Sequence, residues 1–116
     1  MSSWISDSRY GRLAELAAAW LLRARGYRVV GRNLRVAGRE LDVVARRRGV
    51  LVICEVKARR RADRSDPWEA VDARKRERLR FAAALLADAD PTVEEVRFDV
   101  IAVSGLRVRH LRSAFW

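Results

Sequence analysis

Residues 50–57 constrain the fold more than any other part of the chain, because they form a nearly continuous apolar run of strand-forming residues. Such a run is typical of a central β-strand that is covered on both faces. Two charged residues, Glu55 and Lys57, interrupt it near its end, where burying an unpaired charge would cost several kcal/mol. The run therefore predicts a sheet with helices on both faces, and it indicates that Glu55 and Lys57 have partners.

A helical pattern precedes this strand. Ser6, Asp7 and Ser8 can cap a helix that ends at Gly26. Its apolar side chains recur at helical spacing and predict the buried stripe: Leu13, Leu16, Ala17, Trp20, Leu21 and Ala24. Residues 27–36 then predict a strand with a bend at Gly31, and residues 40–46 predict a second strand.

The second half of the chain predicts one more helix and two strands. Asp72 can cap a helix that closes over residues 88–91. The predicted buried stripe of this helix is Leu79, Ala82, Ala83 and Leu86. Strands follow at residues 96–103 and, as a short final strand, at residues 106–111. The order helix, three strands, helix, two strands predicts an α/β fold, with a mixed sheet flanked by helices.

Length and charge bound the possible functions. With 116 residues the chain predicts a single domain, residues 1–116. Its net charge of +10 and pI near 11.3 favour a polyanionic partner, with nucleic acid as the first choice. An anionic membrane is the competitor, but no apolar run approaches the roughly 20 residues of a span. The single cysteine, Cys54, fits a reducing compartment, so we expect a cytoplasmic protein.

The use of lysine is selective. Of 25 basic residues only Lys57 and Lys75 are lysines, and all others are arginines. Lysine is a compact charge whose pKa shifts on burial, which arginine cannot imitate. A chemical role for both positions and a chance remainder of an arginine-rich composition are equally open at this point.

The hairpin between residues 40–46 and 50–57 brings two acids together. If Arg48 and Gly49 form a two-residue loop, Asp42 lies directly across from Glu55. Opposed side chains have Cβ atoms about 5 Å apart, where two carboxylates repel unless a cation lies between them. A three-residue loop would instead set Asp42 opposite Cys54. The two-residue loop predicts a site for a divalent cation.

The same register sets Glu40 across from Lys57, so that all four charged side chains share one face. Mg²⁺, or Mn²⁺ in its place, needs only one or two carboxylates besides waters and phosphate oxygens. Lys57 lies about 7 Å along the strand from Glu55, where its ammonium group can stabilise negative charge or help deprotonate water. The alternative is a solvated hairpin end with Glu40–Lys57 and Glu55–arginine pairs.

An ordered set of motifs carries a family resemblance. The set consists of Gly38-Arg39-Glu40-Leu41-Asp42, Glu55-Val56-Lys57, Arg97-Phe98-Asp99-Val100 and Ala114-Phe115. With these motifs the chain resembles the bacterial YraN-like family from residue 11 to residue 115. That family is similar to archaeal Holliday-junction resolvases and to the nuclease superfamily named for its Pro-Asp and Asp/Glu-x-Lys motifs.

The resemblance implies a restriction-endonuclease-like fold with a metal-dependent site. Asp42 and Glu55 would bind the metal, Lys57 would assist the attacking water, and Glu15 of the first helix would complete the acidic cluster. On spacing alone, an exposed Glu15 is as well supported as a catalytic one. The chain departs from the family pattern at Arg76, where a polar amide is common. Resolvases of this fold act as dimers, so the resemblance also implies a homodimer.

Several other charged residues are candidates for phosphate contact. Lys75 extends the buried stripe of the second helix toward its N-terminus, where phosphates bind readily, although a solvated lysine is equally open. Arginines flank the predicted site and would position nucleic acid through its phosphates: Arg59, Arg60, Arg61, Arg64, Arg74 and Arg78. Asp99 alternates away from its apolar neighbours and is interpreted as structural, paired with an arginine. His110 is expected on an edge strand, outside any catalytic pair.

Two main functions follow from these patterns. The first is a magnesium-dependent endonuclease that hydrolyses DNA phosphodiester bonds, on branched or damaged DNA in repair or recombination. The second is a non-catalytic nucleic-acid-binding module with a vestigial site. A basic protein associated with RNA or the ribosome is a third hypothesis, which predicts a preference for RNA and indifference to loss of the acids.

Overall fold

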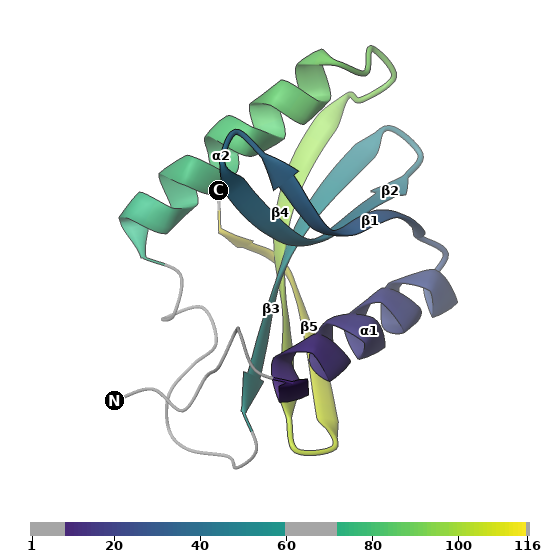
Figure 1. The fold of residues 1–116 in the computed structure, drawn as a ribbon. Coiled ribbons are helices and arrows are strands. Elements are labelled where there is room, and N and C mark those ends of the chain that lie inside the picture. The colour runs from purple at the N-terminus through teal and green to yellow at the C-terminus, as the bar shows by residue number, and fades with distance from the viewer. Residues whose placement is uncertain (1–8, 60–71, 116) are drawn as a thin grey trace.

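The computed structural model describes residues 9–59 and 72–115. In chain order the elements are α1 (Arg9–Ala24), β1 (Arg28–Val36), β2 (Arg39–Arg47), β3 (Val50–Arg59), α2 (Ala73–Asp88), β4 (Glu95–Ser104) and β5 (Arg107–Phe115). This is the predicted order of helix, three strands, helix and two strands (Figure 1). Within these ranges, no helix has the length and apolar character that crossing a membrane requires.

The five strands form one sheet in the order β1-β2-β3-β4-β5. Neighbouring strands are antiparallel except β3 and β4, which are parallel and lie on either side of α2 in the sequence. A parallel pair needs a crossover connection, and here the connection contains this helix. The mixed sheet predicted from the sequence is therefore confirmed.

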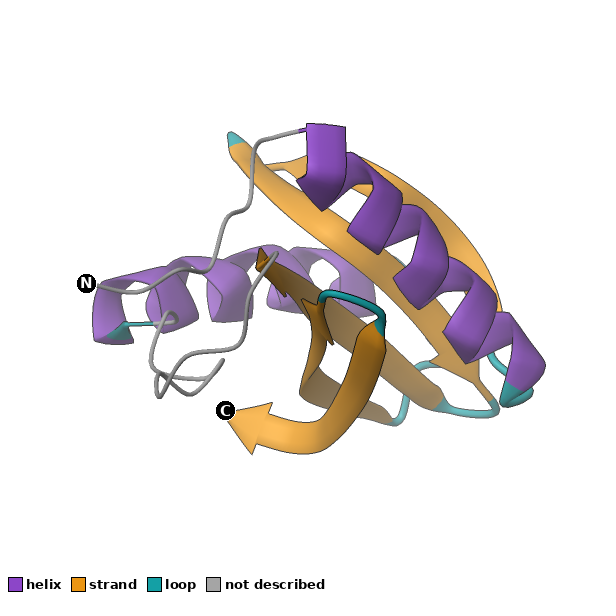
Figure 2. Ribbon diagram, turned by 90° about the horizontal axis from the view of Figure 1, so that it is seen from below, coloured by secondary structure: helices purple, strands orange, loops and turns teal. Residues whose placement is uncertain are grey.

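Strand β3 is the centre of the fold, and eight of its ten residues are buried. Side chains such as Val52 and Val56 pack with α1 on one face of the sheet. Side chains such as Leu51 and Ile53 pack with α2 on the other face. Figure 2 shows the two helices on opposite sides of the sheet. The apolar run in the sequence thus corresponds to a strand covered on both faces.

The buried face of α1 differs from the predicted stripe. Leu13 and Trp20, two members of that stripe, are 61% and 63% exposed. The face that packs against the sheet carries mainly small residues, Ala14, Ala18 and Ala19, together with the larger Leu22. The prediction was wrong because it selected the larger apolar side chains, whereas small side chains let the helix backbone approach the sheet closely.

Helix α2 follows its prediction. Asp72 is the N-cap, and its side chain accepts a 2.8 Å hydrogen bond from the Lys75 N–H. The predicted stripe faces the sheet, with Leu79, Ala82 and Ala83 buried. The N-cap and the apolar spacing are local features, so the sequence alone could locate this helix.

The last strand is longer than predicted. Strand β5 extends to Phe115, and its pairing with β4 shifts between Phe98 and Val100. Ser113, with φ of 51°, lies in this irregular part of the strand. Figure 2 shows β5 curving strongly toward the C-terminus. An irregularity of this kind continues a strand past the point where its alternating pattern breaks.

The predicted hairpin register between β2 and β3 is confirmed. Arg47 pairs with Val50 across a two-residue loop, and the pairing continues regularly to Val43 and Cys54. Arg48, the first loop residue, has φ of 56°, a left-handed conformation that suits a tight hairpin. The three-residue loop is thereby excluded, because it would have shifted every pair by one residue.

Candidate functional site

The candidate site forms where β2 and β3 stop pairing. The last pair is Val43 with Cys54. One residue before Val43, the Asp42 carboxylate accepts a 2.9 Å hydrogen bond from the Val56 N–H. The carboxyl groups of Asp42 and Glu55 are also hydrogen-bonded to each other. The structure thus brings the two acids together, with the Asp42 side chain bonded to the backbone of β3.

Helix α1 contributes a third acid, Glu15, to the same place. Its side chain is only 5% exposed and is hydrogen-bonded to Asp42. With its amide nitrogen facing these carboxylates, Asn33 of β1 donates to Glu15 Oε2 and Glu40 Oε1, each at 2.9 Å. Buried small residues on the same helix face, such as Ala18, allow this approach. Glu15 is therefore part of the acidic cluster and not an exposed glutamate.

Both lysines of the chain lie at Glu55. Lys57 follows two residues later on β3 and is 5% exposed. Lys75, in the first turn of α2, has its Nζ 2.7 Å from Glu55 Oε2. The side chains of Lys57 and Lys75 also contact each other. The two positions that keep lysine in an arginine-rich chain are thus neighbours in space, which gives their selective use a structural reason.

Glu40 takes a different position from the predicted one. The hairpin register had set it across from Lys57, but regular pairing of β2 with β3 ends before this point. Glu40 instead pairs with Arg35 of β1 and is exposed. Its carboxylate is held near Glu15 through Asn33. The prediction assumed an unbroken ladder, which the structure does not have.

A cavity of about 250 Å³ opens onto this cluster. Its lining combines three acids and three basic side chains: Glu40, Asp42, Glu55, Arg35, Arg39 and Lys75. Acids and bases of this kind, converging on one small space, suit a ligand that carries both a phosphate and a bound cation.

The acids have shifted pKa values. Burial raises the pKa of Asp42 from 3.8 to about 9, and the charge of Glu55 acts in the same direction. Burial also raises the pKa of Glu15, although the hydrogen bond with Asp42 opposes this effect. These shifts favour the protonated form of Asp42 at neutral pH, and a proton in the cluster lowers the repulsion between its three carboxyl groups.

The pKa values of Glu55, Lys57 and Lys75 depend on one another. Burial acts to raise the pKa of Glu55, but the hydrogen bond with Asp42 and the charge of Lys75 hold it below its usual value. Burial lowers the pKa of Lys57 to about 8, against the attraction of Glu55. Burial acts to lower the pKa of Lys75, but the ion pair with Glu55 raises the pKa of Lys75 above its usual value. The two lysines therefore differ, since only Lys57 can lose its proton near neutral pH.

One oxygen of Glu55 retains bonding capacity. Its contact with Lys75 is an ion pair, and no described residue gives this buried Oε2 a well-directed hydrogen bond. Carboxylate oxygens with unused lone pairs are the ligands that Mg²⁺ and Mn²⁺ prefer. No three His, Cys, Asp or Glu side chains in residues 9–59 and 72–115 form a ready metal cluster. Asp42 and Glu55 could hold an ion only with waters or phosphate oxygens as further ligands.

The predicted phosphate-binding arginines lie in several environments. Arg74 and Arg78 are exposed on α2. Arg59, at the end of β3, is half-buried, and its Nε donates a 3.0 Å hydrogen bond to Ser104 Oγ. The remaining predicted residues, Arg60, Arg61 and Arg64, lie outside the described part of the chain.

Two cavity residues, Arg35 and Arg39, were not predicted. They flank the turn between β1 and β2, where Ala37 and Gly38 have φ of 53° and 75°. Positive φ at both positions is typical of a two-residue hairpin turn. Counting outward from such a turn sets Arg35 opposite Glu40, as the structure has it. The signal was therefore present, but Ala37 obscured it because alanine rarely adopts positive φ.

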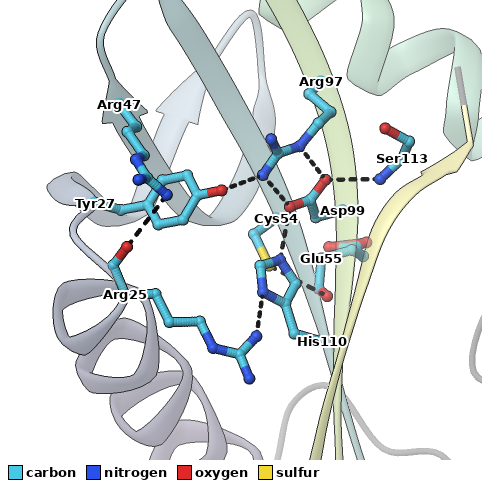
Figure 3. A network of polar contacts seen from close by, with 9 residues as sticks. All are labelled: Arg25, Tyr27, Arg47, Cys54, Glu55, Arg97, Asp99, His110 and Ser113. Carbon is cyan, nitrogen blue, oxygen red and sulfur yellow. Dashed lines mark hydrogen bonds and ion pairs between the residues drawn. The ribbon is translucent and has the colours of Figure 1, made fainter.

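A second buried polar cluster surrounds Asp99, which is fully buried (Figure 3). Arg97 donates from Nε and Nη2 to the two carboxylate oxygens of Asp99, each at 2.9 Å. The Ser113 N–H donates to Oδ1 at 3.0 Å, and Arg97 Nη2 also donates to the Tyr27 hydroxyl at 2.6 Å. The pairing of Asp99 with an arginine agrees with its interpretation as structural. The cluster ties β4 to β5 and to the residues after α1.

His110 belongs to this second cluster. It lies on the edge strand β5, and its Nε2 is 2.7 Å from Asp99 Oδ2. Its Nδ1 is 3.0 Å from Arg25 Nη1, and a guanidinium can only donate. Nδ1 therefore accepts from Arg25, and Nε2 carries the hydrogen that Asp99 accepts. Figure 3 shows His110 between these two partners.

These features identify the kind of protein to which the chain belongs. It is an α/β protein with one open mixed sheet, in which a carboxylate–lysine cluster forms where two antiparallel strands separate. The chain belongs to the family described as Uncharacterised protein family UPF0102, whose model matches residues 14–103. Membership confirms the resemblance that the motifs indicated.

Curated relatives agree with this assignment over most of the chain. The UPF0102 protein STH1475 of Symbiobacterium thermophilum is 42% identical over 113 residues, which cover 92% of this chain and 96% of the relative. A UPF0102 protein of Caulobacter sp. (strain K31) is 43% identical and covers 90% of this chain and 76% of its own length. A third, Franean1_1156 of Parafrankia sp., is 41% identical and covers 94% and 98%.

Proposed function

We propose that this protein is a metal-dependent nuclease that hydrolyses DNA phosphodiester bonds, on branched or damaged DNA in repair or recombination. One observation supports the proposal above all others. Glu55 is 4% exposed, is hydrogen-bonded to a second acid, Asp42, and lies against both lysines of the chain. Burying these charges costs stability, so the cluster is better explained by chemistry than by folding.

The site fits a divalent cation of the hard, oxygen-preferring kind. Asp42 and Glu55 would hold Mg²⁺ or Mn²⁺, with Glu15 orienting Asp42 through their hydrogen bond. When bound, such an ion polarises a phosphoryl oxygen and lowers the pKa of a coordinated water.

The chain's own residues have separate parts in the reaction. Arg35 and Arg39 would bind phosphate oxygens in the cavity and orient the scissile bond. Lys57 Nζ, with a pKa of about 8, would take a proton from the water that attacks phosphorus. The bond from phosphorus to the leaving oxygen breaks, and that oxygen takes up a proton from solvent. Lys75 would remain charged and hold Glu55 in position.

The decisive experiment measures cleavage. Fluorescently labelled duplex, single-stranded and four-way-junction DNA is incubated with the protein in Mg²⁺ or Mn²⁺, and the products are separated on denaturing gels. We expect cleavage that Asp42→Asn, Glu55→Gln and Lys57→Ala abolish while binding persists. Lys57→Arg should also abolish it, because arginine keeps the charge but cannot release a proton. Glu95→Gln, at an exposed residue of β4, is the matched control and should cleave normally.

A non-catalytic nucleic-acid-binding module is the alternative. One observation favours it: the net charge of +10 suits binding to phosphates whether or not the acids act chemically. Salt-sensitive binding without cleavage of any substrate, unchanged by the four site variants, would support this module and reject the nuclease.

A further inference from the structure

A second cavity adjoins the candidate site. It has a volume of about 410 Å³ and lies between the β1–β2 turn and α2. It is lined by Ala37, Gly38, Arg39, Glu77, Arg78 and Phe81. Gly38 and Arg39 line both cavities, so the two spaces share a wall. This volume lies within the range of small-ligand pockets, about 300–1,000 Å³.

Phe81 is the most unusual residue of this second cavity. It is 61% exposed, although the next two residues of α2, Ala82 and Ala83, are buried against the sheet. An exposed aromatic ring on the wall of a cavity leaves a flat apolar face open to a planar ligand. Nucleobases are such partners, because each has a flat π-face that stacks on an aromatic ring whatever its sequence.

The polar residues of the second cavity suit the edges and charges of a nucleotide. Arg39 Nε is buried, and none of the described residues gives it a hydrogen-bond partner. Arg78 adds a second positive charge, and the Glu77 carboxylate can accept from a base amino group. Arg39, on the shared wall, can therefore bond to a ligand that enters both cavities.

We propose that the second cavity receives the base of an unpaired nucleotide whose phosphate lies in the first cavity. Bases of an intact duplex are stacked and paired, and entering such a pocket would require their extrusion. The protein therefore prefers a strand with unpaired nucleotides, as in single-stranded or branched DNA, to a continuous duplex. This inference rests on the proposed function for the phosphate site and adds the class of substrate.

Binding in EDTA tests the pocket without hydrolysis. Fluorescence anisotropy would follow labelled 12-nucleotide probes: a DNA strand, the same strand with abasic residues, its duplex, and the RNA strand. We expect the normal DNA strand to bind about tenfold more tightly than the abasic strand. Phe81→Ala should remove this preference and leave duplex affinity unchanged. Phe81→Trp should keep the preference, because indole also stacks.

Leu85→Ala is the matched control, since Leu85 is an exposed apolar residue of α2, 44% exposed, outside the lining of the second cavity. It should bind every probe as the wild type does. Equal affinity for the normal and abasic strands, or no effect of Phe81→Ala, would overturn the pocket. Binding of the RNA strand that is much tighter than binding of the normal DNA strand, and that Phe81→Ala weakens, would reject DNA as the source of the nucleotide. Cleavage that depends on Asp42 but not on Phe81 would support the nuclease and reject the base pocket. A base preference without cleavage would support the base pocket and reject the nuclease.

Discussion

Asp42 is a half-buried residue that opposes folding at high pH. Its pKa is 3.8 when it is unperturbed, as in the unfolded chain, and about 9 in the folded protein. Between pH 3.8 and about pH 9 the chain therefore takes up a proton when it folds. A raised pKa of an acid means that stability falls as pH rises through this window. We expect Asp42→Asn, which cannot ionise, to gain stability relative to wild type as pH rises.

In EDTA at pH 8.5 the variant should melt about 5 °C higher than wild type, and the gap should shrink at pH 5. Thermal denaturation followed by circular dichroism gives both values. A gap that is the same at both pH values would mean that Asp42 does not hold its proton in the folded state.

The pKa of Asp99 is shifted in the opposite direction to that of Asp42. Burial acts to raise its pKa, but its bonds to His110 and Arg97 hold the pKa below the usual value of 3.8. An acid with a lowered pKa in the folded state stabilises the fold at pH values above its ordinary pKa of 3.8. This stabilisation is lost as pH falls through the lower, folded-state pKa. Asp99→Asn should cost about 3 kcal/mol at pH 7, because it leaves the half-buried Arg97 without its carboxylate partner.

The cost of Asp99→Asn should narrow below about pH 4, because Asp99 of the unfolded wild-type chain then takes up a proton, which folded Asp99 with its lowered pKa binds only at lower pH. Urea denaturation at pH 7 and pH 3 measures this change. Asp88→Asn, at an exposed residue of α2, is the control and should cost little at either pH. An Asp99→Asn cost that does not change with pH would contradict the role of its charge.

The two faces of helix α1 differ in burial. Leu22 is fully buried, whereas Leu13 on the opposite face is 61% exposed. Leu22→Ala should therefore lower the free energy of unfolding by about 3 kcal/mol, because it leaves a cavity between helix and sheet. Leu13→Ala should change it by less than about 0.5 kcal/mol. Similar losses in the two variants, measured by urea denaturation, would contradict the observed face.

One part of strands β2 and β3 forms a regular ladder, and the other part forms the candidate site. From Arg47–Val50 to Val43–Cys54 they form a regular ladder, and beyond it the Asp42 carboxylate bonds to the Val56 N–H. The separation of the strands leaves room for Glu15 and Lys75 to approach from different helices. The site therefore depends on the end of the ladder as much as on the residues themselves.

The molecule as a whole brings the site together from five elements, because Asn33 and Arg35 of β1 join the residues of α1, β2, β3 and α2. If Asp42 and Glu55 bind a divalent cation, the cation stabilises only the folded protein, because the unfolded chain has no such site. Mn²⁺ or Mg²⁺ at 100 times the dissociation constant should add about 2.7 kcal/mol to the free energy of unfolding.

We expect Mn²⁺ to raise the melting temperature of wild type by several degrees and EDTA to reverse the change. Glu55→Gln should lose the effect, while Glu95→Gln should keep it. Differential scanning fluorimetry measures all of these, and an equal rise in wild type and Glu55→Gln would place any bound ion elsewhere.

The order of the elements and the register of the β2–β3 hairpin could be predicted from the sequence. These depend on short-range causes: the apolar run of β3, the Asp72 cap and the loop at Arg48 and Gly49. Such causes act within a few residues, so periodicity and turn chemistry reveal them.

The buried face of α1 and the contact of Lys75 with Glu55 could not be predicted, because both depend on tertiary packing. Both faces of α1 carry apolar residues, and the choice depends on close approach to the sheet and on the hydrogen bond between Glu15 and Asp42. Lys75 reaches Glu55 across the whole connection from β3 to α2. Contacts between residues distant in the chain arise from packing, which no local pattern encodes.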